Sequence, residues 1–266
     1  FLAITHDCEH KVKELLSDFD IILRGNSDRV FSVFKSLSGL NRYGVQMPIP
    51  VIYSYLKKFQ ELNLDSDEEY KEALPFFLEC LERFHFINNF ILSEPSNKVE
   101  THYGNFAQKF SEAKDKREFD DVERELFDKL KLGSKDDFIE EFTKLNYTQN
   151  NPKIKEILYR IKLINKKNGQ CQPSSYAKKY LIDPSLKKDS WDAEHWLAQK
   201  ASKDLLSKLE SPDDIHNIGN ILLISRTLNN KLQNLTIQQK VSKLTLNRIE
   251  HDLQDPEFVD FVEEYS

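Results

Sequence analysis

Glu194-His195 is followed by His216-Asn217-Ile218-Gly219-Asn220, an apolar run and Asn229, and this part of the sequence decides the fold. At about pH 7 a neutral imidazole can take a proton from water. A carboxylate and the oxygen of a carboxamide are hard ligands that suit an ion such as magnesium. Together, these side chains have the chemistry for metal-assisted hydrolysis of a phosphodiester.

Two short strands and a helix are predicted around these side chains. One strand spans 190–197 and contains the Glu-His pair, and the other spans 220–225, where an apolar run follows a Gly-Asn turn signal. Over 227–244, apolar residues recur at helical spacing without Pro or Gly, which predicts one continuous helix. Because adjacent side chains of a regular strand point to opposite faces, we expect Glu194 or His195 to lie where the first strand frays or bulges.

In their order and spacing, these elements resemble the HNH nucleases with a ββα-metal fold, specifically the C-terminal nuclease domain of GmrSD-type modification-dependent restriction proteins. That family reads roughly Glu-His-Ile-x-Pro-Gln, then Gly-Asn-Leu-x-Leu, then a further Asn and a later Lys. The counterparts here are Glu194-His195-Trp196-Leu197-Ala198-Gln199, Gly219-Asn220-Ile221-Leu222-Leu223, Asn229 and Lys240. Trp196 stands in place of an aliphatic residue and Ala198 in place of the proline, and neither position carries a side chain assigned to chemistry.

This resemblance implies a role for each matching residue. His195 would be the general base, and Asn220 would shape the loop and orient the histidine. Glu194 and Asn229 would bind a divalent metal ion, Mg²⁺ or Mn²⁺. Lys240 would contact a phosphate or serve a structural role. The implied substrate is double-stranded DNA, and the implied biological role is restriction of modified or foreign DNA, as in defence against phages.

Each of these residues also has an ordinary structural interpretation. A Glu-His pair is often a solvated strand edge, Gly219-Asn220 is a turn, and Asn229 with Asn230 can cap a helix. The order and spacing of all three together favour a site. We interpret His216 as a loop residue, and the alternative is a second metal ligand.

The net charge of −6 disfavours DNA binding in general, because phosphates are neutralised by Lys and Arg. Basic residues are nevertheless concentrated in 153–188, which holds ten of them and two acidic residues. Since this segment leads into the first predicted strand, we predict a DNA-binding rim beside His195. A lysine-rich solvated helix face is the alternative. The rim residues expected to matter most are Lys166, Lys167, Lys178 and Lys179.

The 266 residues are enough for one large domain or two ordinary ones. Polar residues over 146–152 separate two helical patterns and predict a boundary, and the next helix is expected over 152–166. We therefore expect a helical domain over 1–148 and an HNH nuclease domain over 149–266. The fold class predicted for the whole is mainly α, a helical bundle with an embedded ββα-metal motif.

Residues 1–145 have helical periodicity almost throughout. Helices are predicted over 12–23, 30–37, 51–62, 103–113, 120–132 and 135–144, with a long helix or a helix pair over 66–92. The spacing of Ser66 and Glu69 predicts a capping box at the start of the latter. Its aromatic residues are expected in the core of a helix bundle rather than stacked on bases. They are Phe76, Phe77, Phe84, Phe86 and Phe90.

Three cysteines, Cys8, Cys80 and Cys171, stand far apart, which argues against a zinc knuckle or a disulfide framework and fits a reducing cytosol. The sequence contains no apolar run of the length of a membrane span, and we expect a cytoplasmic protein. The chain begins at Phe1 and contains one methionine, Met47. We therefore expect a fragment without the N-terminal nucleotide-handling domain, or partner subunit, that the resemblance implies.

Three classes of function fit the sequence. The first is a metal-dependent HNH endonuclease. The second is a catalytically inactive module with the same fold that binds DNA or a partner, which Ala198 and the overall acidity keep open. The third is a helical interaction protein with no role in nucleic-acid chemistry, which requires the Glu-His, Gly-Asn and Asn pattern to be accidental.

Overall fold

A computed structural model describes residues 27–95, 97–162, 165–167, 170–172, 191–198, 207, 209, 211–232 and 235–246. These residues are mostly helical, which confirms the prediction of a mainly α protein. The chain divides into two compact units, Phe1–Glu141 and Phe142–Ser266. None of the helices in the described part of the chain is long and apolar enough to cross a membrane.

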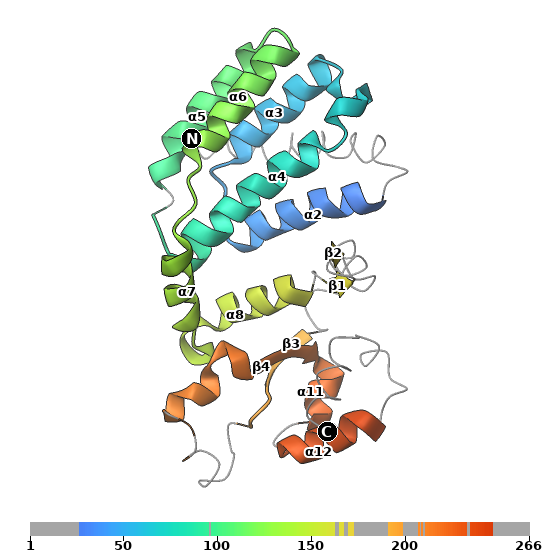
Figure 1. Ribbon diagram of the computed structural model, residues 1–266, viewed down its shortest axis with the longest axis vertical. Coiled ribbons are helices and arrows are strands. Elements are labelled where there is room, and N and C mark those ends of the chain that lie inside the picture. Colours follow the sequence, from blue (N-terminus) through green and yellow to red (C-terminus); the bar gives the residue numbers. More distant parts are fainter. Residues whose placement is uncertain are drawn as a thin grey trace. The chain divides into compact units, whose positions relative to one another are not determined.

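The first unit is a bundle of helices (Figure 1). In chain order its elements are α2 (Ser27–Arg42), α3 (Ile49–Glu61), the 3-10 helices η1 (Leu64–Ser66) and η2 (Glu68–Tyr70), α4 (Ala73–Phe84), the π-helix η3 (His85–Ile91), α5 (Asn97–Glu112), α6 (Lys116–Lys129) and most of α7 (Lys135–Thr143). Helix α3 packs against α5, α2 against α4, and α5 against α6. The helices predicted from residue 30 onward are therefore present, and the one predicted over 12–23 lies outside the described residues.

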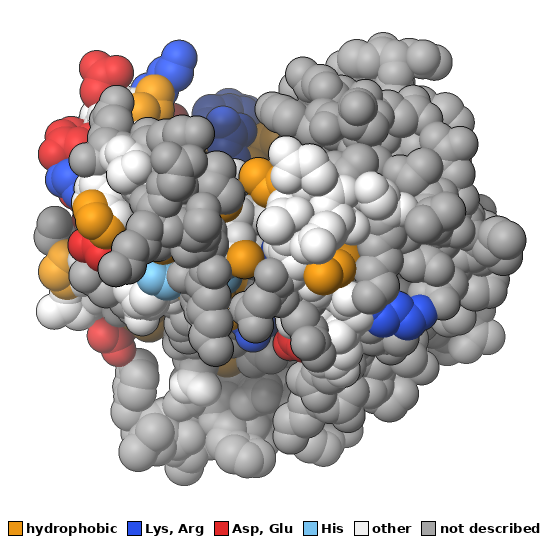
Figure 2. All heavy atoms as spheres, turned by 90° about the horizontal axis from the view of Figure 1, so that it is seen from below, with side chains coloured by type: hydrophobic (Ala, Val, Ile, Leu, Met, Phe, Trp, Pro, Cys, Tyr) orange, Lys and Arg blue, Asp and Glu red, His pale blue; other side chains and the backbone are white. Residues whose placement is uncertain are grey.

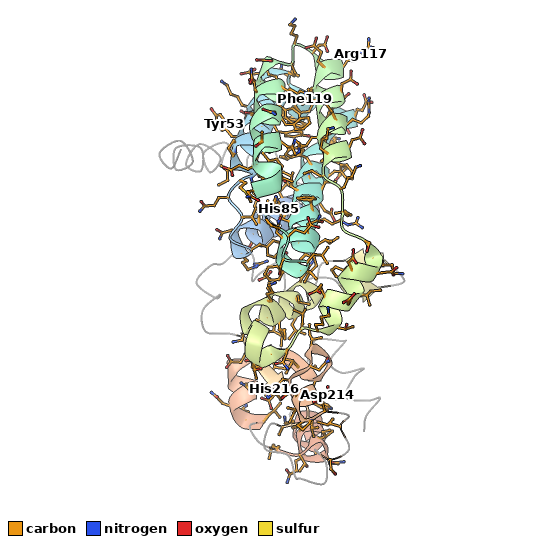
Figure 3. All side chains as sticks on the ribbon, turned by 90° about the vertical axis from the view of Figure 1, so that its left-hand side faces the viewer. Tyr53, His85, Arg117, Phe119, Asp214 and His216 are labelled. Carbon is orange, nitrogen blue, oxygen red and sulfur yellow. The ribbon has the colours of Figure 1, made fainter. Side chains whose placement is uncertain are left out.

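Aromatic side chains form the centre of this bundle. Tyr55 of α3 stacks on Phe77 of α4 with ring centroids 3.8 Å apart, and Phe119 of α6 packs against Tyr55 at 4.8 Å. All three side chains are fully buried, and Figure 3 shows Phe119 between the helices. Such contacts between rings add to the free energy gained by burying apolar area.

The prediction of an aromatic core is confirmed for Phe77, Phe84 and Phe86, which are buried. It is wrong for Phe76, whose side chain is 56% exposed and meets Phe127 edge-on, with centroids 5.7 Å apart. Adjacent residues of a helix point about 100° apart, so Phe77 and Phe76 cannot both face the same core.

The predicted capping box at Ser66 and Glu69 is wrong. Ser66 ends the 3-10 helix η1, and the oxygen that accepts the hydrogen bond of the Glu69 backbone N–H belongs to Asp67, at 3.1 Å. Asp67 can accept this bond because it is the residue directly before η2, in extended conformation. Helix α4 begins only at Ala73, with Pro75 in its first turn, where a proline is tolerated.

The described part of the second unit combines helices with short antiparallel strands (Figure 1). Its elements in chain order are α8 (Tyr147–Lys162), β1 (Asn165–Lys167), β2 (Gln170–Gln172), β3 (Trp191–His195), η5 (Pro212–His216), η6 (Ile218–Asn220), β4 (Ile221–Ser225), α11 (Arg226–Leu232) and α12 (Ile237–Leu246). Strand β1 pairs with β2, and β3 pairs with β4. Helix α11 packs against both β3 and β4.

The helix predicted over 152–166 has different bounds in the structure. It begins at Tyr147 and ends at Lys162, and the chain continues into the strand pair β1–β2. The sequence contains a signal for this pair, because Asn168-Gly169 stands between the paired residues Lys167 and Gln170, and Asn-Gly is a strong two-residue hairpin signal.

The single helix predicted over 227–244 is also wrong, because the structure has two helices there, α11 and α12. Thr236 starts the second one. Its hydroxyl accepts from the backbone N–H of Gln239 at 3.3 Å, and the Gln239 side chain accepts from the backbone N–H of Thr236 at 2.9 Å. This reciprocal capping box satisfies backbone groups that a continuous helix would use internally, so the chain starts a new helix without Pro or Gly.

Candidate active site at the end of strand β3

Strands β3 and β4 form an antiparallel pair in unbroken register, from Trp191 opposite Ser225 to His195 opposite Ile221. The two predicted strands are therefore confirmed. Glu194 and His195 both belong to the ladder, and the paired register contains no bulge. His195 is the last residue of β3, so of the two residues expected where the strand frays or bulges, it is the one that stands at the end of the strand.

Asn220 forms hydrogen bonds that connect the segment after β3 with the segment before β4. Its side-chain oxygen accepts from the backbone N–H of Leu197 at 2.8 Å, and its amide donates to the carbonyls of Leu197 at 3.1 Å and Ile215 at 2.7 Å. The backbone carbonyl of Asn220 accepts from the N–H of Trp196 at 2.8 Å. Asn220 thus holds the segment directly after β3 against the segment directly before β4.

His195 is 7% exposed and contacts two other rings. Its Nε2 lies 3.1 Å from Nδ1 of His216, and the two ring planes are nearly perpendicular, at 88°. The ring of Tyr147 stands at 87° to His195, with centroids 5.0 Å apart. Burial lowers the pKa of His195 to about 4, and its electrostatic interactions with His216 and Lys240 act in the same direction. At neutral pH the ring is therefore uncharged.

The sequence predicts a loop position for His216 and carries no local signal for its contact with His195. His216 ends the 3-10 helix η5, and Figure 3 shows it close to Asp214, which belongs to the same helix. The sequence does carry a signal for η5, since Ser211 and Asp214 form a capping box and Pro212 occupies the first helical position. The contact itself joins residues far apart in the chain, which periodicity does not detect.

Glu194 forms an ion pair with Lys240. The Lys240 side chain is 0% exposed, and its ammonium donates to Oε1 of Glu194 at 2.6 Å. It also donates to the backbone carbonyls of His195 at 2.5 Å and Trp196 at 3.2 Å. Burial raises the pKa of Glu194, and the hydrogen bond and charge of Lys240 oppose this rise. Lys240 of α12 thus contacts the end of β3 from a position without solvent access.

Asn229 of α11 lies beside a carboxylate that sequence analysis did not consider. Its amide nitrogen is 3.4 Å from Oδ2 of Asp192. Asp192 stands two residues before Glu194 in β3, so both carboxylates lie on the same face of the strand. The alternation of side chains in the predicted strand was the signal that could have drawn attention to Asp192.

The four lysines of the predicted DNA-binding rim are only partly covered by the structure. Lys166 and Lys167 lie in β1, opposite Cys171 and Gln170, rather than in a helix. Lys178 and Lys179 lie outside the described residues. On the face shown in Figure 2, the described Lys and Arg side chains are scattered rather than gathered in one patch. The rim therefore stays a prediction.

The strand pair thus carries a buried histidine at the end of β3, directly after Glu194 in the ladder. Residues 132–258 match the family of GmrSD restriction endonucleases, C-terminal domain. This match confirms the resemblance found in the sequence. Neither the comparison with curated proteins nor the comparison with solved structures gave a match.

Proposed function

We propose that this protein is a metal-dependent DNA endonuclease of HNH type and that its nuclease domain is the segment 149–266. The observation that carries the proposal is the position of His195 at the end of β3. It stands next to Glu194 in the ladder, and Asn220 holds the flanking segments together. The restriction endonuclease family matched by residues 132–258 supports double-stranded DNA as the substrate and restriction of modified or foreign DNA as the role.

A divalent metal ion suits the donor atoms assigned to it, the Glu194 carboxylate and the Asn229 carboxamide. Carboxylate and carboxamide oxygens suit Mg²⁺ or Mn²⁺, which are often held by one or two carboxylates and water. Among the described residues, no three His, Cys, Asp or Glu side chains gather in a metal-binding arrangement, so the ion would depend on the Asn229 carboxamide and on water. Lys240 contacts Oε1 of Glu194, and a carboxylate has a second oxygen that can bind a cation.

In the proposed reaction, Glu194 and Asn229 would hold the ion, and Asp192 accepts from the amide nitrogen of Asn229. When bound, the ion stabilises the negative charge that develops on the phosphate and on the leaving oxygen. His195 takes a proton from the attacking water, which requires the neutral ring that its lowered pKa provides at neutral pH. Asn220 keeps His195 in place through the segments that it joins.

The metal requirement is tested by plasmid cleavage with added Mg²⁺ or Mn²⁺, with and without a chelator. Cleavage should be lost in chelator, and Asn229→Ala should reduce it strongly, because a ligand is removed. The adjacent, exposed Asn230 offers a matched control, and Asn230→Ala should cleave at the wild-type rate. Cleavage that continues unchanged in chelator would show a metal-free reaction and contradict the proposal.

The second candidate function is a module with this fold that binds DNA or a partner without cleaving it. The buried Lys240–Glu194 pair favours it, because an ammonium ion at the carboxylate opposes the approach of a metal ion. This candidate predicts DNA binding by the wild-type chain with no cleavage at any concentration of Mg²⁺ or Mn²⁺. Metal-dependent cleavage that requires His195 excludes it.

A further inference from the structure

The contact between His195 and His216 has a geometry that bears on how His195 acts. Nε2 of His195 and Nδ1 of His216 are 3.1 Å apart, which is hydrogen-bond distance for two nitrogens. The imidazole of His195 is buried, with the ring of His216 perpendicular to it and that of Tyr147 also perpendicular. Since rings pack against it from two elements, His195 has little freedom to turn.

The backbone that carries His216 is itself held in place. The backbone N–H of Ser211 donates to Oδ2 of Asp214 at 2.8 Å at the start of η5. At its end, the carbonyl of the buried Ile215 accepts from the Asn220 amide at 2.7 Å. The next residue after His216, Asn217, forms an isolated β-bridge with Asn146. His216 is therefore presented to His195 from a segment anchored on both sides.

The direction of the hydrogen bond decides which nitrogen of His195 can act as a base. In a pair of neutral imidazoles one ring donates and the other accepts. If His195 donates from Nε2, its Nδ1 carries the lone pair that takes a proton from water. If His216 donates, Nδ1 of His195 already carries a proton and Nε2 is occupied, so neither nitrogen can act as a base.

We infer that His216 is a positioning residue that accepts the Nε2 proton of His195 and so holds this ring in the tautomer with the lone pair on Nδ1. The inference rests on the proposed function of His195 as the general base. When water gives its proton to Nδ1, the resulting imidazolium keeps its Nε2 proton on His216. The same contact therefore orients the neutral ring and stabilises the charged one, as the carboxylate of a catalytic triad does for its histidine.

Nuclear magnetic resonance of the metal-free, 266-residue chain with ¹⁵N-labelled histidine tests the hydrogen bond directly. The wild type should show a proton on Nε2 of His195, in slow exchange with water and shifted downfield. This signal should be lost in His216→Leu and kept in His216→Asn, whose carboxamide oxygen can occupy the position of Nδ1. A proton found on Nδ1 of His195 in the wild type, or a signal unchanged in His216→Leu, overturns the inference.

Steady-state cleavage of DNA tests the consequence. His216→Leu should lower kcat by about 10- to 100-fold and leave KM unchanged, because the base is misoriented while DNA contacts are kept. His216→Asn should recover most of kcat, which a merely structural role of the ring would not explain. His102→Leu, on α5 in the other unit, is the matched control and should cleave as the wild type does. Equal kcat for His216→Leu and the wild type contradicts the inference.

The two tests separate this inference from the proposed function. Absence of metal-dependent cleavage by the wild type contradicts the proposed function, and the Nε2 proton of His195 still shows whether His216 sets its tautomer. A wild type that cleaves DNA and requires His195, with an Nε2 signal unaffected by His216→Leu, supports the proposed function and refutes the positioning role of His216.

Discussion

The ammonium of Lys240 lies 2.6 Å from Oε1 of Glu194, and the Lys240 side chain has no solvent exposure. Lys240 reaches this carboxylate from α12 and also binds two backbone carbonyls at the end of β3. The ion pair therefore ties the C-terminal helix of the described chain to the strand that carries His195. A buried charge that loses its partner is costly, so this pair makes the site sensitive to a change in α12.

Lys240→Met should destabilise the protein by about 3–5 kcal/mol, because it leaves the buried Glu194 carboxylate without its counter-charge. The double variant Glu194→Gln with Lys240→Met should recover part of this loss, since no charge is then buried. The exposed pair of Lys116 with Asp67 provides the control, and Lys116→Met should destabilise the protein much less than Lys240→Met does. Urea unfolding followed by circular dichroism measures all three. Equal losses for Lys240→Met and Lys116→Met would contradict the structural role of Lys240.

Asn220→Ala should destabilise the protein by about 2–4 kcal/mol, because it removes three side-chain hydrogen bonds to the backbone at Leu197 and Ile215. Thermal unfolding measures this loss. The exposed Asn217 makes one such bond, to the N–H of Gly219 at 3.0 Å. Asn217→Ala should therefore cost about 1 kcal/mol or less, and a larger loss than for Asn220→Ala would show that the wrong asparagine has been assigned to the junction.

The stability of the first unit should depend on the protonation of Glu123 in α6. Burial raises the pKa of Glu123 to about 7, with the nearby charge of Asp120 in the same direction and a hydrogen bond from Tyr55 at 3.1 Å against it. In the unfolded chain the pKa is about 4.5, so between about pH 4.5 and 7 the folded state holds a proton that the unfolded state has lost. Stability therefore falls as pH rises through this range and levels off above it.

Glu123→Gln should remove this dependence, so that its stability relative to the wild type increases from about pH 4.5 to 7 by on the order of 1–3 kcal/mol. Urea unfolding at several pH values measures the difference. Glu112→Gln, at an exposed position of α5, serves as the control and should give a profile parallel to that of the wild type. A constant difference between Glu123→Gln and the wild type across this range would show that Glu123 is not responsible.

The predicted rim is tested by neutralising Lys166, Lys167, Lys178 and Lys179 together. If these residues contact phosphates, DNA binding should weaken and the slope of log affinity against log salt should decrease by about 0.9 per lost contact on duplex DNA. A control set in the first unit, Lys114, Lys116, Lys129 and Lys131, should change neither quantity. Equal effects of the two sets would mean that the basic segment 153–188 is an ordinary solvated surface.

The strand pair could be predicted because its signals are local. An apolar run after Gly219-Asn220 and the Glu-His pair ahead of it define the two strands, and the structure pairs them in register. The division of the last helix into α11 and α12 was missed because its signal is a Thr-x-x-Gln capping box at Thr236, which an unbroken apolar periodicity conceals.

Contacts between distant residues explain the rest of what sequence analysis missed. His216, Lys240 and Asp192 each contact a site residue that belongs to a different element. The periodicity of a single helix or strand cannot predict such a contact. Lys240 shows this most clearly, since its place in the sequence matched the family and its burial was evident only in the structure. Phe76 was misjudged for a different reason, because two adjacent phenylalanines of one helix cannot share the same face.

The proposed role of His195 as the general base of a metal-dependent DNA endonuclease is tested by the cleavage of supercoiled plasmid by His195→Ala. In Mg²⁺ or Mn²⁺ this variant should cleave at least about 100-fold more slowly than the wild type. Its unfolding free energy should stay within about 1–2 kcal/mol of the wild type, because the variant keeps the backbone pairing of β3. Cleavage by His195→Ala at the wild-type rate would show that His195 is not the general base.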